Sequence, residues 1–238
     1  DWPVAHAGEY LAVIADGMGG HAAGDIAARI AGESFIVSYA QDAKDPIGAN
    51  DEAISKDTRA PRLAAAADHA NVGIANAVSV EASLKGMGTT LVGVLFSERG
   101  LEWVSIGDSP LYLIRDGELA LLNEDHSLAP ALDKMVAEGR MTAERARNDP
   151  RRHMLRSAVT GETIELMDLS HKPLALGAGD IIIAATDGLD TLERDEIARI
   201  ATAYANDGAQ QITAALLRAV ENAREEYQDN ATVITAKL

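Results

Sequence analysis

The stretch that decides the fold is residues 89–122, TTLVGVLFSERGLEWVSIGDSPLYLIRDGELALL. It holds four apolar runs rich in branched and aromatic residues, which is typical of β-strands. The runs are Thr89 to Phe96, Leu101 to Ile106, Leu111 to Arg115 and Glu118 to Leu122. Each gap between them is short and contains a glycine. Connections this short join antiparallel strands, because a parallel crossover needs about a dozen residues or more.

The segments on either side of this meander keep strands and helices apart. Upstream we predict a strand over Glu9 to Ala15, helices over about Gly24 to Tyr39 and Leu63 to Ala77, and a loop over Asp42 to Asp57. Downstream we predict a polar, partly helical segment over Pro130 to Arg156, strands over Ile164 to Leu169 and Asp180 to Ala185, helices over Glu193 to Tyr204 and Ala209 to Tyr227, and a last strand over Thr232 to Ala236. This order predicts an α+β fold, with central strands and outer helices, in a single domain over residues 1–238.

The composition excludes several classes of function. The chain has 37 acidic and 21 basic residues in 238, so its formal charge of −16 disfavours binding to nucleic acid and to anionic membranes. It has no cysteine, which excludes a disulfide scaffold, a zinc ribbon and a thiol nucleophile. No apolar run is long enough to span a membrane and no leader opens the chain. We therefore expect a cytoplasmic protein.

Four aspartates stand where predicted strands end or begin. Asp16 and Asp187 follow strands and precede glycines, Asp108 follows another strand, and Asp229 precedes the last one. Singly, each is typical of a turn. Together, strand ends that share a core can bring carboxylates together, and such carboxylates repel one another unless a cation or a proton lies between them. Hard oxygen ligands of this kind suit Mg²⁺ or Mn²⁺.

The motifs around these acids resemble those of a known family. Val13 to His21, VIADGMGGH, is similar to the signature of bacterial metal-dependent protein phosphatases, the PPM or protein phosphatase 2C family. Five more motifs follow in that family's order and spacing: Gly86 to Thr90 (GMGTT), Ile106 to Ser109 (IGDS), Asp125 to Ser127 (DHS), Ala185 to Leu189 (ATDGL) and Asp229 to Val233 (DNATV). The resemblance covers essentially the whole chain.

This resemblance implies a β-sandwich of two antiparallel sheets flanked by helix pairs, with a flap over about residues 130–156. It also implies two Mn²⁺ or Mg²⁺ ions at one edge of the sandwich and a third, weaker ion. Asp16 would bridge the two ions, the Gly17 carbonyl would bind one of them, and Asp187 and Asp229 would complete the second. Asp108, together with Asp187, would belong to the third site, next to the flap.

The resemblance further implies a serine/threonine protein phosphatase in which metal-activated water, without a phosphoenzyme, attacks the phosphorus. His21 is the candidate general acid, although a histidine here could equally begin a helix. We interpret His126 as structural and Met18 and Met87 as packing residues. The implied partners are phosphorylated proteins, or small regulatory proteins of a partner-switching pathway, and we expect a monomer.

The chain departs from the family pattern in two places. Asp1 occupies the last position of the family's N-terminal acidic motif, so it is a further candidate ligand, and we expect a truncated N-terminal motif without its phosphate-binding arginine. Pro110 stands where the family usually has arginine, beside Asp108. These departures keep an alternative open: a catalytically impaired, phosphatase-like regulatory binding module.

Overall fold

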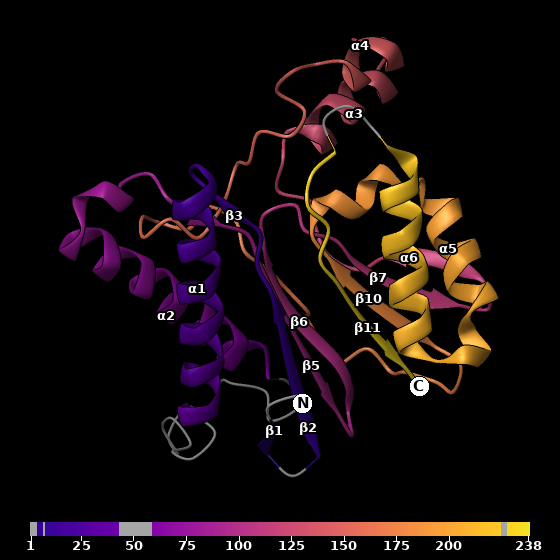
Figure 1. Cartoon of the computed structure of the whole chain (residues 1–238), viewed down its shortest axis with the longest axis horizontal. Helices are drawn as coiled ribbons and strands as arrows, with labels where there is room; N and C mark the ends of the chain where they lie inside the picture. The colour runs from indigo at the N-terminus through magenta and orange to yellow at the C-terminus, as the bar shows by residue number, and fades with distance from the viewer. Residues whose placement is uncertain (1–3, 7, 43–58, 225–227) are drawn as a thin grey trace.

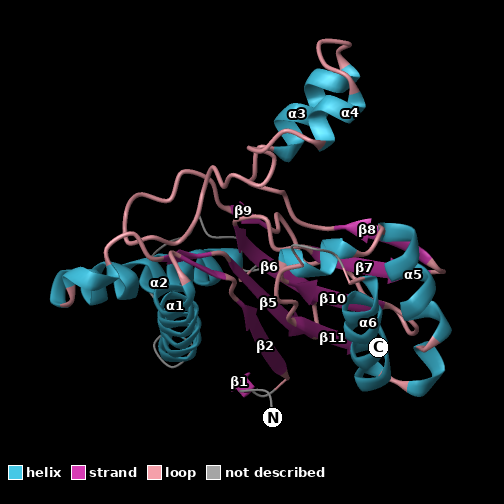
Figure 2. Cartoon of the chain, turned by 45° about the horizontal axis from the view of Figure 1, so that its top comes forward, coloured by secondary structure: helices cyan, strands magenta, loops and turns pink. Residues whose placement is uncertain are grey.

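Two antiparallel β-sheets stack on each other, and a pair of helices covers the outer face of each (Figures 1 and 2). This computed structural model describes residues 4–6, 8–42, 59–224 and 228–238. The first sheet has the strand order β1 (Val4–His6), β2 (Glu9–Ile14), β5 (Leu91–Ser97), β6 (Gly100–Ile106) and β9 (Asp168–Leu169). The second has the order β11 (Val233–Lys237), β10 (Ile181–Ala185), β7 (Leu111–Arg115) and β8 (Glu118–Leu121). A short ribbon pairs β3 (Gly17–Met18) with β4 (Gly88–Thr89).

The predicted meander forms, but it is divided between the two sheets. β5 pairs with β6 in the first sheet, from Leu91 opposite Ile106 to Ser97 opposite Gly100. β7 pairs with β8 in the second sheet through a two-residue turn, Asp116 and Gly117, both with positive φ. That is the turn geometry that suits the twist of a hairpin, and Asp-Gly is one of the sequences that adopt it.

The helices have the following bounds. On the first sheet lie α1 (His21–Asp42) and α2 (Ala60–Val80); on the second lie α5 (Arg194–Ala203) and α6 (Ala209–Ala223). α3 (Ala129–Ala137) and α4 (Ala143–Arg147) project away from the sandwich (Figure 2). Short 3₁₀ turns are η1 (Ala82–Leu84), η2 (Asp187–Thr191) and η3 (Ala205–Asp207).

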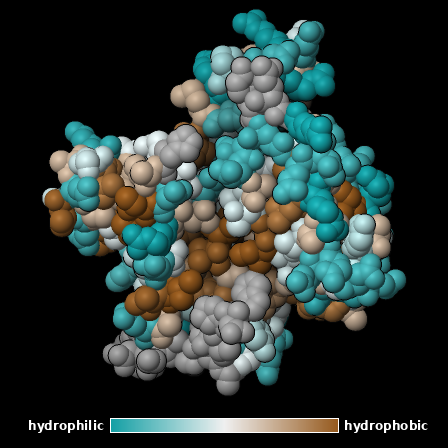
Figure 3. Space-filling model, in the orientation of Figure 1, coloured by the Kyte–Doolittle hydropathy of each residue, from teal (hydrophilic) through white to brown (hydrophobic). Residues whose placement is uncertain are grey.

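Three apolar cores hold these four layers together. α1 and α2 pack on the first sheet through a core that includes Phe35 and Leu91, and α5 and α6 pack on the second through one that includes Ile183 and Leu216. The core between the sheets includes Val92 and, from the second sheet, residues such as Leu113 and Ile182. Burial on both faces explains why the central strands are nearly continuous apolar runs. In Figure 3 hydrophilic residues cover much of the helices, and apolar residues show between the two helix pairs.

The predicted α+β class and the antiparallel sandwich with flanking helices are confirmed, with two corrections to individual elements. The strand predicted over Ile164 to Leu169 is reduced to β9, which pairs only with Val104 and Ser105 of β6. The helix predicted to reach Tyr227 ends at Ala223, because Arg224 adopts a left-handed conformation with φ of 50°. Residues 225–227 and the loop predicted over Asp42 to Asp57, except for its first residue, lie outside the described residues. No helix in the described part of the chain is long and apolar enough to cross a bilayer.

Candidate metal centre

Four of the predicted acids line one pocket of about 530 Å³. Asp16 follows β2 and Asp108 follows β6, so both come from the first sheet. Asp187 follows β10 at the start of η2, and Asp229 precedes β11, so both come from the second. The strand ends of the two sheets therefore bring together carboxylates that lie more than 200 residues apart in the sequence. Gly17, whose carbonyl the resemblance assigns to a metal, lines the same pocket.

Glycines next to these acids allow their loops to pack closely. A Cβ atom on Gly17 would lie 2.0 Å from the carbonyl oxygen of Gly24 in the first turn of α1. A Cβ atom on Gly188 would lie 2.2 Å from the carbonyl oxygen of Asn230. The Asp-Gly pairs of the sequence are thus explained by close backbone contacts that exclude any larger residue.

Threonine side chains fix the loops that carry the acids. The Thr89 hydroxyl donates to the Asp16 carbonyl at 2.8 Å, and Thr90 binds the same loop. On the second sheet, Thr186 and Thr232 hold the two acid-bearing loops together. The Thr232 N–H donates to Thr186 Oγ1 at 3.0 Å, and the Thr186 N–H donates to the Thr232 carbonyl at 3.0 Å. The loops that carry the acids are therefore held in place by hydrogen bonds from threonines.

The electrostatics of the pocket favour a positive ion. Burial and the neighbouring carboxylates Asp187 and Asp229 raise the pKa of Asp16 to about 7. Burial, Asp187 and Asp125 raise the pKa of Asp108 to about 7. The pKa of Asp187 is also raised, by burial and by Asp229. Without a cation, Asp16 and Asp108 hold protons near neutral pH, which reduces the repulsion among the carboxylates.

One buried oxygen supports the fit of a metal directly. Asp187 Oδ1 is buried and has no hydrogen-bond partner among the residues that the structure describes. An unsatisfied carboxylate oxygen is costly to bury, and a divalent ion is a ligand that would satisfy it. Over the described ranges, no three His, Asp or Glu side chains form a group that could hold a metal ion by themselves. Mg²⁺ commonly binds through one or two carboxylates and keeps several waters, so the carboxylates present fit a hydrated ion.

A segment after α4 also lines the pocket. Its pocket-lining residues run from His153 to Glu165 and include Arg156 and Met154. No motif in the sequence marks His153 or Arg156 as functional. Both lie in the predicted flap, whose many charged residues are typical of a solvated surface, and only the fold brings these two into the same pocket as the acids.

The remaining predicted residues have different outcomes. His126 is buried, and its ring Nδ1 accepts a hydrogen bond from the Gly107 N–H at 3.2 Å, so the structural interpretation is confirmed. Met87 is buried in the core under α1 and α2, as predicted, whereas Met18 lines the acid pocket. His21 is the first residue of α1, but the position of its side chain lies outside what the structure describes, as does all of Asp1.

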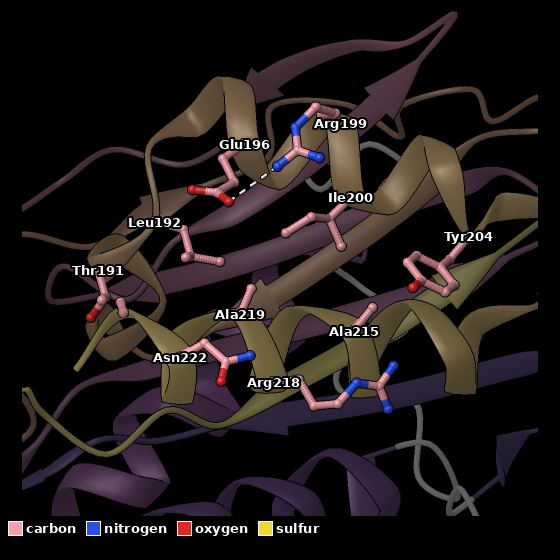
Figure 4. Close-up of a pocket in the computed structure, with 11 residues that line it drawn as sticks. Thr191, Leu192, Glu196, Arg199, Ile200, Tyr204, Ala215, Arg218, Ala219 and Asn222 are labelled. Carbon is pink, nitrogen blue, oxygen red and sulfur yellow. Dashed lines mark hydrogen bonds and ion pairs between the residues drawn. The ribbon is translucent and has the colours of Figure 1, made fainter.

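A second pocket, of about 560 Å³, lies between α5 and α6 (Figure 4). Its lining contains one carboxylate, Glu196, which is paired with Arg199 at 3.1 Å. Arg218 projects from the facing helix in the same view. This pocket offers no cluster of oxygen ligands, so the candidate metal centre is the pocket at the strand ends.

Comparison with known proteins agrees with this geometry. The family described as Protein phosphatase 2C matches residues 1–232. The serine/threonine protein phosphatase PstP of Mycobacterium tuberculosis is 38% identical over 80% of this chain, and the match spans 34% of PstP. The serine/threonine phosphatase stp of Listeria monocytogenes is 31% identical over 76% of this chain and 67% of its own length. The chain thus spans about a third of the length of the first of these relatives.

Solved structures give the same result. The crystal structure of PstP from M. tuberculosis superposes with a TM-score of 0.74 and 33% identity, covering 96% of this chain and 88% of that chain. A structure of the PstP catalytic domain in complex with two manganese ions superposes with a TM-score of 0.66 and 31% identity, covering 94% and 85%.

Proposed function

Because the chain belongs to the protein phosphatase 2C family, we propose that it is a metal-dependent serine/threonine protein phosphatase. The observation that carries this proposal is the convergence of Asp16, Asp108, Asp187 and Asp229 on one pocket, with a buried oxygen of Asp187 left unsatisfied. Its substrates would be proteins that carry phosphoserine or phosphothreonine.

Two Mn²⁺ or Mg²⁺ ions would bind to these carboxylates. We assign Asp16 to both ions, the Gly17 carbonyl to one, and Asp187 and Asp229 to the other. We assign Asp108 to a third and weaker ion, and Asp1 remains a further candidate. The relative whose structure is in complex with two manganese ions supports this number. When bound, the ions would neutralise phosphate charge and lower the pKa of water, which would make it a nucleophile toward the phosphorus at neutral pH.

The chain's own side chains would orient the reactants and move protons. Asp16 and Asp108 would lose their protons as cations bind, since the positive charge stabilises the ionised carboxylates and offsets the effects of burial and of the neighbouring acids. The departing serine or threonine oxygen needs a proton, and we assign its delivery to His21 at the start of α1. Residues 130–156 would act as a flap beside the pocket.

The alternative of an impaired binding module is not favoured. It predicts that the acid cluster would erode, because buried carboxylates are costly without a cation. All four carboxylates line the pocket together. We further propose that residues 1–238 form one domain, which works in the cytoplasm as a monomer and binds no nucleic acid.

The test is metal-dependent release of phosphate from a phosphothreonine peptide. The parent protein should be active with manganese and inactive with a chelator. Asp187→Asn should lower kcat/KM by about 100-fold or more, because it removes a charged ligand. The matched control is Asp207→Asn, which makes the same change on an exposed turn. A manganese-loaded protein that releases no phosphate, or an Asp187→Asn variant as active as the control, would contradict the proposal.

A further inference from the structure

The segment around Arg156 is fastened on both sides. The Arg156 N–H donates to the His126 carbonyl at 2.8 Å, and Leu155 forms a β-bridge with Ser127. On the other side, the Ser157 hydroxyl donates to the Leu166 carbonyl at 2.8 Å and accepts from the Leu166 N–H at 3.0 Å. The backbone position of Arg156 is therefore fixed at the edge of the pocket.

The side chain of Arg156 differs from those of Arg151 and Arg152 in its hydrogen-bond partners. Arg151 makes two hydrogen bonds with the carboxylate of Asp149, at 3.0 and 2.8 Å. Arg152 makes two with the carboxylate of Asp133, at 2.8 and 2.9 Å. The Arg156 side chain is exposed and lines the acid pocket, and among the described residues its guanidinium has no hydrogen-bond or ion-pair partner. Because its backbone is fixed and its guanidinium is unpaired, Arg156 can form charge-assisted hydrogen bonds with an anion that enters the pocket.

His126 connects this segment to the strand end that carries an acid. The ring Nδ1 of His126 accepts a hydrogen bond from the Gly107 N–H. The backbone N–H of His126 donates to the Gly107 carbonyl at 3.1 Å. Its carbonyl holds Arg156. A single buried residue thus fixes the distance between Arg156 and the loop of Asp108, the residue after Gly107.

The charge of the pocket explains why such a cation matters. Five carboxylates line this pocket, the four aspartates and the exposed Glu165, and they repel a phosphate monoester dianion unless cations offset their charge. An arginine in the lining of the same pocket can hold two phosphate oxygens at once through its planar fork, which a lysine cannot do.

We propose that Arg156 binds the non-bridging oxygens of the substrate's phosphate group, and that His126 is the positioning residue that holds it over the pocket. This inference rests on the proposed phosphatase function. The same chemistry applies to the product, inorganic phosphate, which gives a probe that does not depend on turnover.

The first experiment measures binding of inorganic phosphate to the manganese-loaded protein by calorimetry. Arg156→Gln should raise the dissociation constant about 10- to 100-fold, the range for a lost charge-assisted hydrogen bond. It should leave manganese affinity unchanged. Arg151→Gln is the matched control, because it removes the same charge five residues away and outside the pocket. With a phosphothreonine peptide, Arg156→Gln should raise KM more than it lowers kcat, and Arg156→Lys should recover only part of the loss.

The second experiment tests the role of His126. His126→Asn keeps a side-chain acceptor for the Gly107 N–H, whereas His126→Leu removes it. Phosphate affinity should therefore stay within about threefold of the parent in the first variant and fall about tenfold in the second. In the Arg156→Gln background, His126→Leu should add less than about twofold, because the residue it positions is already missing. Thermal melting identifies any variant that fails to fold, and His126→Asn still tests the idea if the leucine variant does.

Three results would overturn the inference. Phosphate affinity unchanged in Arg156→Gln, or equally reduced in Arg151→Gln, would show that Arg156 is not a specific anchor. Equal losses in folded His126→Asn and His126→Leu would exclude positioning by the ring acceptor. Failure of the phosphatase function itself is separate: it would appear as no metal-dependent turnover in the parent, while phosphate binding still reports on Arg156.

Discussion

Thr90 and Asp16 are joined by a reciprocal pair of hydrogen bonds although 74 positions separate them. The Thr90 N–H donates to the Asp16 carbonyl at 2.9 Å, and the Asp16 N–H donates to Thr90 Oγ1 at 3.0 Å. Thr90 Oγ1 also lies 2.7 Å from the hydroxyl oxygen of Ser109, the residue after Asp108. One hydroxyl thus ties together the loops of two acids in the pocket.

Thr90→Val should loosen both loops while keeping the shape of the side chain. The Asp16 N–H would lose its partner, so the free energy of unfolding should fall by about 1–3 kcal/mol. Manganese affinity, measured by calorimetry, should fall about tenfold because one ligand loop is no longer braced. Thr213→Val is the control, since it removes a 2.7 Å bond to Thr235 on another surface. It should lower stability and leave manganese affinity unchanged; a parallel loss of affinity would refute the bracing role.

Metal binding should weaken as the pH falls below neutral. The pKa values of Asp16 and Asp108 are raised to about 7, so at pH 6 protons compete with cations for both. Apparent manganese affinity should drop roughly tenfold per pH unit for each proton displaced. Calorimetric titrations at pH 6, 7 and 8 check this. An affinity that does not vary over this range would contradict the raised values.

Asp16 and Asp108 should make the stability of the metal-free protein fall as the pH rises, whereas metal affinity rises with pH. Their folded pKa values lie above the unfolded value of 3.8, so the folded state holds extra protons between about pH 4 and 7. Their contribution therefore makes the metal-free protein less stable as the pH rises through this window, and the whole penalty is present above pH 7. Melting temperatures in chelator at pH 5.5 and 8 test the sign. An Asp16→Asn variant should show a flatter profile than the parent.

Asp108→Asn should separate the third ion from the first two. Asp108 carries only the weaker site in our assignment, so two tightly bound manganese ions per chain should remain. Turnover should nevertheless fall by about tenfold or more, because the negative charge that would hold the third ion is lost. Calorimetry gives the number of tight sites and a phosphopeptide assay gives the rate. Loss of a tight site would show that Asp108 is a primary ligand.

Gly93→Ala should destabilise the fold by overpacking the core between α1 and the first sheet. A Cβ atom at Gly93 in β5 would lie 2.3 Å from the Phe35 ring of α1, which is fully buried. Overpacking of this kind costs about 1–3 kcal/mol. Gly32→Ala is the control, because a Cβ atom there meets only Val13 at 3.8 Å within a helix that favours alanine. Chemical denaturation should show a loss for the first and none for the second.

Much of the fold was predictable because short-range signals agree with the packing. Glycine and Asp-Gly turns delimit apolar runs, and those runs became β5 to β8. The strand predicted over residues 164–169 shows the limit of this approach. Ile164, Met167 and Leu169 do pack against the core under α1 and α2, so their apolar character was interpreted correctly. Apolarity reports burial, however, and backbone pairing there extends over only two residues.

The acids of the site were predictable because each stands beside a strand and a recognisable motif. Arg156 was not, since three arginines occur at positions 151, 152 and 156, and the sequence does not show which of them reaches the pocket. In the structure Arg151 pairs with Asp149, two residues away, and Arg152 pairs with Asp133, 19 residues away. The backbone of His126 holds Arg156 at the pocket. Pairing of this kind depends on how the segment after α4 returns to the sandwich.

The division of the acids between the sheets has a consequence for the lifetime of the folded chain. Asp16 and Asp108 follow strands of one sheet, whereas Asp187 and Asp229 adjoin strands of the other. A divalent ion bound by aspartates of both sheets would cross-link the two sheets. The sheets could then separate only after the ion dissociates. Resistance of the folded protein to proteolysis should therefore rise with manganese concentration. The ion needed for catalysis would then also determine the lifetime of the folded protein.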